Sequence, residues 1–183
     1  VKRYADYPRI NLIKNYINKC EEQTVELTAE NWWLPSDSIR LDVSARNLNK
    51  FNVNIYRVYS DTPQYDKLSE LGSPVYTQTC PIKSNGILSS NEKIQLPPLD
   101  CGRYLLTVNF ANKKGDTITT TSQKIFSVSN LTTFYHKVND EQRLYVVRAD
   151  NGQPVTNALL TFTENGKEVQ RQRINRYGYA VID

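Results

Sequence analysis

The stretch Leu99-Asp100-Cys101-Gly102-Arg103-Tyr104-Leu105-Leu106-Thr107-Val108 decides the fold of this chain. Pro97 and Pro98 end the strand before it, because proline cannot donate a hydrogen bond to a sheet ladder, and Gly102 permits a tight turn. From Tyr104 onward the residues alternate with the period of two that is typical of a β-strand. In Greek-key sandwiches a tyrosine just after such a corner bonds through its hydroxyl to upstream backbone. We therefore predict the sixth strand of an immunoglobulin-like sandwich, with Tyr104 buried near the corner.

Six further strand candidates surround this stretch, and each is short and bounded by turn residues. They are Thr24 to Thr28, Ser38 to Arg46, Phe51 to Tyr59, Val75 to Pro81, Lys93 to Leu96 and Thr117 to Val128. In the second of them, Ile39, Leu41, Val43 and Ala45 fall on one face. Seven strands at this spacing predict a sandwich over residues 24–128.

Two segments between these strands are predicted to be loops or turns that connect them. The stretch from Asp61 to Gly72 is a polar loop, in which Pro63 can begin a single helical turn. Lys113-Lys114-Gly115-Asp116 predicts a hairpin turn, because glycine supplies the unusual φ angle that tight turns need.

A second set of strands follows the short junction at Ser129-Asn130. Its members are Leu131 to Val138, Leu144 to Ala149, Ala158 to Thr163, Lys167 to Arg173 and Tyr179 to Ile182. Asp150-Asn151-Gly152 and Glu164-Asn165-Gly166 predict hairpin turns, since Asn-Gly readily adopts positive φ. Fewer residues remain here than the roughly 100 of a complete sandwich. We expect residues 129–183 to be a second sandwich that is truncated.

Residues 8–20 are the one convincing helix, and we expect residues 1–23 to form a separate helical segment. Pro8 suits a first helical position. Ile10, Ile13, Ile17 and Cys20 fall close to one face, which Leu12 and Tyr16 widen. This stripe must pack against another surface, either the sandwich that follows or a preceding domain.

Composition excludes several classes of protein. The 183 residues carry a net charge of +4 from 23 basic and 19 acidic residues, which are interspersed, so we expect no nucleic-acid partner. No apolar run approaches the ~20 residues of a membrane span, so no direct membrane insertion is expected. The chain opens without an initiator Met or a signal peptide, as a mature form or an excised piece would. Cys80 and Cys101 could pair in an oxidising compartment, or both could remain free as small apolar residues.

We find no residue pattern that carries catalysis. The single histidine, His136, lies on a predicted strand and has no Ser-x-x-Lys or Gly-x-Ser-x-Gly motif beside it. Glycine-rich phosphate loops and calcium loops are absent. The carboxylates Asp61, Asp66 and Glu70 are explained by a solvated loop. The sequence therefore predicts a protein that is not an enzyme, with no catalytic residue, no cofactor and no metal site.

Trp32 and Trp33 are the best candidates for a binding surface. Exposed paired tryptophans can stack on sugars or anchor a protein partner. The alternative is that both rings pack against the first helix or a neighbouring domain, which the large apolar area of each ring favours.

Several motifs in the two halves point to one family. They are Leu41-x-Val43-x-x-Arg46-Asn47, Val53-x-Ile55-Tyr56-Arg57-Val58, Leu96-Pro97-x-Leu99-x-x-Gly102-x-Tyr104, Gly152-Gln153-Pro154-Val155-x-x-Ala158 and Asn175-x-x-Gly178-Tyr179-Ala180. In this order they resemble the macroglobulin (MG) domains of the bacterial alpha-2-macroglobulin family. The family usually has Thr-Asp before the last glycine, and Arg173-Ile174-Asn175 departs from that pattern.

The resemblance implies all-β, macroglobulin-like sandwiches and a structural role. In that family, cleavage of a bait region triggers the entrapment of a protease, and MG domains form the supporting shell. The chain would then be a non-catalytic fragment of an endopeptidase inhibitor in the periplasm or cell envelope, whose parent is lipid-anchored. Its partners would be a target protease, reached through the parent, and neighbouring MG domains. The alternative is a cell-surface module that binds glycan or protein through Trp32, Trp33 and the loop from Asp61 to Gly72.

Cys20-Glu21-Glu22-Gln23 matches the thioester tetrad Cys-x-Glu-Gln of the same family. The family's tetrad lies inside a large helical domain, whereas this one lies at the end of a single helix. We therefore predict that Cys20 and Gln23 form no thioester and that the tetrad is a solvated helix end.

Overall fold

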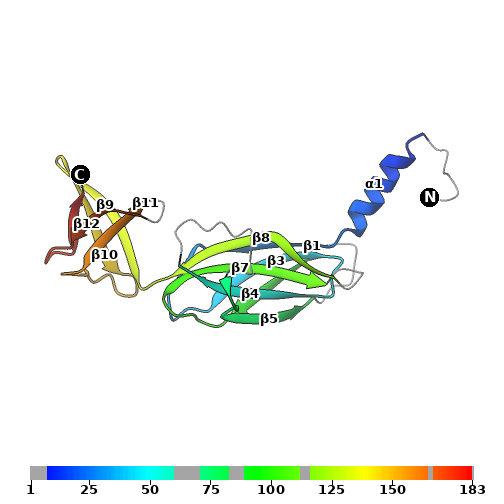
Figure 1. Cartoon of the computed structure of the whole chain (residues 1–183), viewed down its shortest axis with the longest axis horizontal. Helices are drawn as coiled ribbons and strands as arrows, with labels where there is room; N and C mark the ends of the chain where they lie inside the picture. Colours follow the sequence, from blue (N-terminus) through cyan, green and yellow to red (C-terminus); the bar gives the residue numbers. More distant parts are fainter. Residues whose placement is uncertain (1–7, 60–70, 83–88, 112–115, 165–166, 183) are drawn as a thin grey trace.

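A computed structural model describes residues 8–59, 71–82, 89–111, 116–164 and 167–182, without the side chains of residues 118–122 (Figure 1). The fold is all-β apart from one helix, α1 (Ile10–Glu21), which confirms the predicted class. Most of the predicted Asp61–Gly72 loop, and most of the turns at Lys113–Asp116 and Glu164–Gly166, lie outside the described residues.

The first sandwich is built from two sheets. One has the strand order β2-β8-β7-β4-β5 and the other the order β1-β3-β6. The strands are β1 (Thr24–Ala29), β2 (Trp32–Trp33), β3 (Ile39–Arg46), β4 (Lys50–Val58), β5 (Tyr76–Pro81), β6 (Ser90–Leu96), β7 (Gly102–Ala111) and β8 (Thr117–Val128). Neighbouring strands are antiparallel, except that β2 runs parallel to β8. The seven predicted strands are all present, and β2 is the addition.

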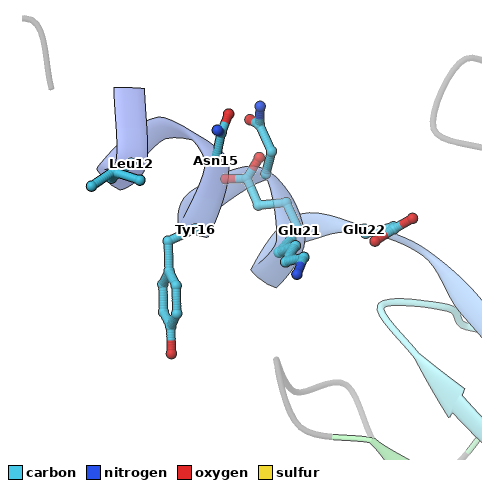
Figure 2. A pocket seen from close by; sticks show the side chains of 7 residues that line it. Leu12, Asn15, Tyr16, Glu21 and Glu22 are labelled. Carbon is cyan, nitrogen blue, oxygen red and sulfur yellow. The ribbon is translucent and has the colours of Figure 1, made fainter. Parts of the chain in front are cut away.

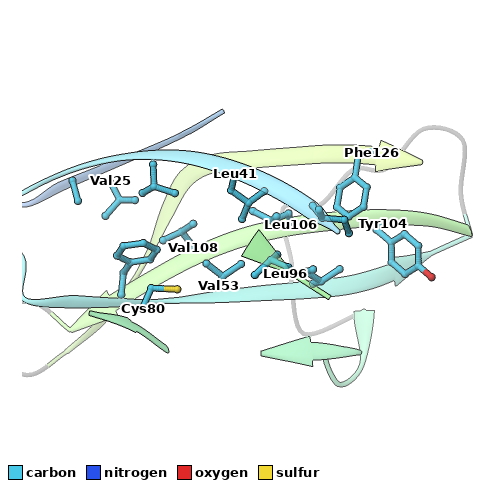
Figure 3. Close-up of a cluster of buried hydrophobic side chains, with 14 of the residues drawn as sticks. Val25, Leu41, Val53, Cys80, Leu96, Tyr104, Leu106, Val108 and Phe126 are labelled. Atoms are coloured by element: carbon cyan, nitrogen blue, oxygen red, sulfur yellow. The ribbon is translucent and has the colours of Figure 1, made fainter. Parts of the chain in front are cut away.

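The hydrophobic core lies between these two sheets (Figure 3). On β3, burial alternates, so that Ile39, Leu41, Val43 and Ala45 all face the core as predicted. Across the gap, Leu106 and Val108 on β7 are fully buried. Each such side chain contributes about 1.5–3 kcal/mol when it leaves water, so this core dominates the stability of the sandwich.

The predicted tyrosine corner is present at the start of β7. The Tyr104 hydroxyl donates a hydrogen bond of 2.8 Å to the backbone carbonyl of Asp100. The ring is 2% exposed and stacks on Phe126 of β8 at a centroid distance of 5.5 Å. Burial raises the pKa of the Tyr104 phenol above its usual value, because the charged form would lose water.

A smaller β unit follows the first sandwich along the chain. Its three-stranded sheet has the order β13-β10-β9, and β11 and β12 form a separate hairpin. The strands are β9 (Leu131–Val138), β10 (Glu141–Arg148), β11 (Leu159–Glu164), β12 (Lys167–Arg173) and β13 (Tyr179–Ile182). Among the described residues of this unit, only four apolar side chains are buried, namely Leu144, Val146, Ile174 and Ala180.

Two of the motifs noted in the sequence, the one that begins at Gly152 and the one that contains Gly178, both form backbone hydrogen bonds to β10. The Val155 N–H donates to the Val146 carbonyl at 2.9 Å, and the Val146 N–H donates to the Gly178 carbonyl at 3.0 Å. Gly178 has φ +81°, and a Cβ atom placed on it would lie 2.4 Å from the Pro154 Cβ. Only glycine fits at 178, because any side chain would collide with the proline of the other motif.

The helix differs from its prediction at the first turn. It begins at Ile10, with Arg9 as an N-cap residue that makes no side-chain capping bond. Pro8 therefore lies in the preceding turn and not at the first helical position. No residue of α1 is buried, and the helix projects from one end of the first sandwich (Figure 1). The described part of the sandwich thus does not cover the apolar stripe.

Candidate interaction surfaces

Trp32 and Trp33 lie on β2, the edge strand that pairs with β8. Backbone bonds fix this edge, since the Ser127 N–H donates to the Asn31 carbonyl at 2.9 Å and the Ser129 N–H donates to the Trp33 carbonyl at 3.0 Å. Successive side chains on a strand point to opposite faces. Trp33 is 5% exposed and belongs to the core, whereas Trp32 is 40% exposed. The two indoles therefore do not form an exposed pair, which was one of the two alternatives left open by the sequence, and Trp33 packs within its own sandwich.

Trp33 lines a groove of about 710 Å³ together with residues of β1, β3 and β6. The Arg40 guanidinium lies 5.7 Å from the centre of its ring. Arg40, Asp42 and Lys93 give the groove charges of both signs. The indole Nε1 is buried and has no hydrogen-bond partner in the described structure. Trp33 acts mainly as a core residue, and Trp32 is the ring that remains accessible to a partner.

An aromatic ladder lines one face of the β13-β10-β9 sheet. Phe134 and Tyr145 are stacked at a centroid distance of 5.0 Å with nearly parallel planes. Tyr145 contacts Tyr179 at 5.2 Å, and Tyr179 stacks with Tyr177 at 6.4 Å. Sheet register creates this ladder, because Tyr145 lies directly opposite Phe134 on one side and Tyr179 on the other.

Two arginines cover the ladder. The Arg143 guanidinium lies 4.9 Å from the centre of the Tyr179 ring and also pairs with Glu141 at 2.9 Å. The hydrogen bond to Glu141 is the main reason why the pKa of Arg143 is raised. Arg176 lies 4.8 Å from the centre of the Tyr177 ring. Ring faces already engaged in these contacts are not free for a base or a sugar, so the ladder is better suited to stabilising the sheet than to stacking on a ligand.

The sequence did not reveal this ladder as a unit. Its members come from three strands and from the turn before β13. Each aromatic residue alone is typical of a strand. Only the cross-strand register, which a single sequence does not give, brings the four rings together.

Asn47 joins the helix to the first sandwich. It adopts φ 56° in the turn between β3 and β4. Its side-chain amide donates to the Cys20 carbonyl at 2.7 Å and to the Glu22 carbonyl at 2.9 Å. The Gln23 side-chain amide donates to the Asn47 carbonyl at 3.1 Å. The residues of the thioester-like tetrad thus take part in a joint between α1 and the sheet.

The three cysteines are free in the structure. Cys80 is buried, Cys101 is exposed and Cys20 is intermediate. Cys80 is therefore not paired with Cys101, which was one of the two possibilities open from the sequence. Burial raises the pKa of the Cys80 thiol, because desolvation disfavours the thiolate.

The described residues contain no obvious catalytic centre. His136 is exposed on β9. Within the described part of the chain, no group of three or more His, Cys, Asp or Glu side chains is arranged to hold a metal ion. None of the helices in the same residues is long and apolar enough to span a membrane.

A three-stranded sheet packed on a five-stranded sheet, with a tyrosine corner, defines an immunoglobulin-like β-sandwich. No protein-family profile matches the sequence, and no curated protein matches it. Solved structures that are similar in fold include the following two. A crystal structure of native alpha-2-macroglobulin from Escherichia coli spanning domains MG0-NIE-MG1 has TM-score 0.64 at 20% identity, over 88% of this chain and 57% of that chain. A second, spanning domains NIE-MG1, has TM-score 0.62 at 18% identity, over 89% of this chain and 88% of that chain.

At these identities the likeness establishes the fold. The chain has the fold of macroglobulin-type domains of a bacterial alpha-2-macroglobulin, which confirms the resemblance that the motifs predicted. It spans a little over half, 57%, of the longer of the two solved chains.

Proposed function

We propose that this chain is a non-catalytic structural fragment of a bacterial alpha-2-macroglobulin-like endopeptidase inhibitor, a protease trap. In this proposal residues 1–23 are a helical segment, residues 24–128 are one macroglobulin-like sandwich and residues 129–183 belong to a second. The fragment positions neighbouring macroglobulin domains of the parent and reaches the target protease only through the parent. Its compartment is the periplasm or cell envelope, and the parent is lipid-anchored.

The observation that carries this proposal is the shared order of two β units. A single sandwich is a widespread fold that hosts many functions. Here the similarity to the NIE-MG1 fragment extends over 89% of this chain and 88% of that one, so that it includes both units and not one alone.

The proposal is tested by asking whether the parent protein shields large substrates from an endopeptidase. The parent is incubated with an endopeptidase, and hydrolysis is then measured with a large protein substrate and with a short peptide substrate. A trap suppresses cleavage of the large substrate while it leaves cleavage of the peptide almost unchanged, because only the peptide reaches the enclosed enzyme. The isolated chain should suppress neither reaction. A parent that protects no substrate would refute the proposal.

The alternative function is a cell-surface module that binds glycan or protein. Its supporting observation is Trp32, whose ring is 40% exposed at a sheet edge. The burial of Trp33 removes half of the surface that this alternative needs. A glycan-binding screen with the intact chain and its Trp32→Ala variant distinguishes the two functions, because binding that depends on Trp32 is required only by the alternative.

A further inference from the structure

The helix α1 separates apolar and polar residues completely. Successive helical residues are about 100° apart around the axis, so that position in the sequence gives position on the surface. The apolar residues Ile10, Leu12, Ile13, Tyr16, Ile17 and Cys20 fall on one arc of about 160°. The polar residues Asn11, Lys14, Asn15, Asn18, Lys19 and Glu21 fill the remainder. We call the first set the apolar stripe.

The apolar stripe is open to solvent. Leu12 is 64% exposed, Ile13 42%, Tyr16 73% and Ile17 36%. Figure 2 shows the Leu12 and Tyr16 side chains projecting from the helix surface. An isolated helix of 12 residues is marginal in water, and helices of this length are usually stabilised by covering their apolar face. The stripe therefore needs a partner.

Basic residues border the stripe on both edges. Lys14 lies beside Ile10 and Ile17 on one edge, and Lys19 lies on the other edge, one turn after Tyr16. Arg9 precedes the first turn, which contains no acidic residue. Glu21, the last helical residue, lies on the edge of Lys14, one turn after Ile17, and Glu22 follows it. The charged residues around the stripe are therefore basic from Arg9 to Lys19, and the acidic Glu21 and Glu22 follow at the end of the helix that Asn47 holds against the sandwich.

We propose that α1 lies in the plane of an anionic lipid surface, with the apolar stripe in the boundary between headgroups and acyl chains. Short amphipathic helices with basic borders bind in this way. Lys14 and Lys19 can extend their apolar stems along the stripe while their ammonium groups reach lipid phosphates. Tyr16, near the middle of the stripe, suits the membrane interface because its ring is apolar and its hydroxyl is polar.

This arrangement differs from a membrane-spanning helix, for which no helix of the described residues is long and apolar enough. It is also favoured over a second copy of the chain. The 12 residues of α1 are fewer than two heptads and too short for a stable coiled coil, and the seam of a helix pair is narrower than this arc. A deep protein groove would have to desolvate both bordering lysines, whereas a lipid surface leaves them in contact with water and phosphate.

The hydrogen bonds of Asn47 link the proposed contact between α1 and lipid to the position of the first sandwich. Because the Asn47 amide bonds to the Cys20 and Glu22 carbonyls, the end of the helix is held against the first sandwich. Adsorption of α1 would therefore hold the first sandwich close to the lipid surface. The inference goes beyond the proposed function and does not depend on protease trapping.

Vesicle binding by the full chain tests the inference. The protein is cosedimented with vesicles of phosphatidylglycerol and phosphatidylcholine in equal parts, and with vesicles of phosphatidylcholine alone. We expect binding to the anionic vesicles that is at least about tenfold stronger than to neutral ones and that weakens as salt rises. In a Cys101→Ser background, an environment-sensitive dye on Cys20 should shift its emission to the blue, because Cys20 lies on the stripe. Wild-type protein that does not sediment with anionic vesicles would overturn the inference.

Two double variants and one control assign the binding to α1. Ile13→Asn with Ile17→Asn removes part of the stripe, and Lys14→Glu with Lys19→Glu reverses its border charges. Each should weaken binding at least about tenfold.

The control, Lys50→Glu with Lys93→Glu, makes the same change in net charge at exposed positions on the sandwich, and it should bind almost as well as wild type. Equal loss in the control would place the contact elsewhere and overturn the inference. A dimer in solution that the isoleucine variants dissociate would assign the stripe to a second copy and would also overturn it.

Discussion

Removing the Tyr104 hydroxyl should destabilise the first sandwich by about 1 kcal/mol. The Tyr104→Phe substitution keeps the ring, its burial and its stacking on Phe126, and removes only the 2.8 Å hydrogen bond to the Asp100 carbonyl. A hydrogen bond of this kind contributes about 0.5–1.5 kcal/mol net. Asp100 is an exposed residue, so water can reach its freed carbonyl and the loss should not approach the larger cost of a buried unpaired group.

Urea denaturation followed by tryptophan fluorescence measures this loss selectively. Both tryptophans of the chain, Trp32 and Trp33, lie in the first sandwich, so their emission does not report on the second unit. For a slope of about 2 kcal/mol per molar urea, the expected loss lowers the midpoint by about 0.5 M.

The matched control is Tyr56→Phe on the neighbouring strand β4. Tyr56 is half-buried, and its hydroxyl makes no hydrogen bond among the described residues. This variant should leave the midpoint almost unchanged. Equal midpoints for Tyr104→Phe and wild type, or equal losses for the two variants, would refute the tyrosine corner as a source of stability.

The dependence on pH gives the same prediction an independent check. Burial raises the folded-state pKa of Tyr104 above the value of about 10 in the unfolded chain. The unfolded tyrosine therefore ionises first as pH rises, and ionisation favours unfolding. The advantage of wild type over Tyr104→Phe should be constant below about pH 10 and shrink above it. An advantage that grows with pH in this range would contradict the stated cause.

Three further predictions concern other parts of the chain. Gly178→Ala should destabilise the second unit by about 2–4 kcal/mol, because alanine is strained at φ +81° and its Cβ would lie 2.4 Å from the Pro154 Cβ. Near-UV circular dichroism of the tyrosines during urea unfolding measures this loss. An unchanged unfolding transition would refute the prediction. Methylamine should leave the intact mass unchanged, and an adduct on Gln23 with release of the Cys20 thiol would show a thioester. Expressed separately, residues 24–128 should melt cooperatively while residues 129–183 are unstable or self-associate, and a monomeric, cooperatively folding 129–183 would contradict this expectation.

The first sandwich was predictable from sequence because its strands alternate cleanly. On β3 every second residue is buried, and that pattern is visible in the letters alone. Tyr104 was equally predictable, because a glycine turn and two prolines fix the position of the corner. Local chemistry thus determined both features, and neither depended on knowing which strands pair.

The candidate surfaces were harder to predict, because they depend on which face of a strand turns inward. Trp32 and Trp33 are neighbours in sequence, yet β2 places one in the core and the other at the surface. Two adjacent tryptophans do not indicate which of them will be buried, since the answer depends on the register between β2 and β8. The start of α1 was misjudged for a local reason, because Pro8 suits a first helical turn but here precedes it.

The second unit is stabilised by different interactions from those of the first sandwich. Four buried apolar side chains among its described residues give it a small core. Leu144 and Val146 lie on one face of the β13-β10-β9 sheet. On the opposite face, Tyr145 contacts Phe134 and Tyr179, and Arg143 covers Tyr179. Aromatic pairs contribute about 0.5–1.5 kcal/mol each beyond their buried area, and exposed cation–π contacts about 0.5–1 kcal/mol. The ladder therefore supplies a few kcal/mol, comparable to the burial of one or two leucines, without requiring a second layer of structure on that face.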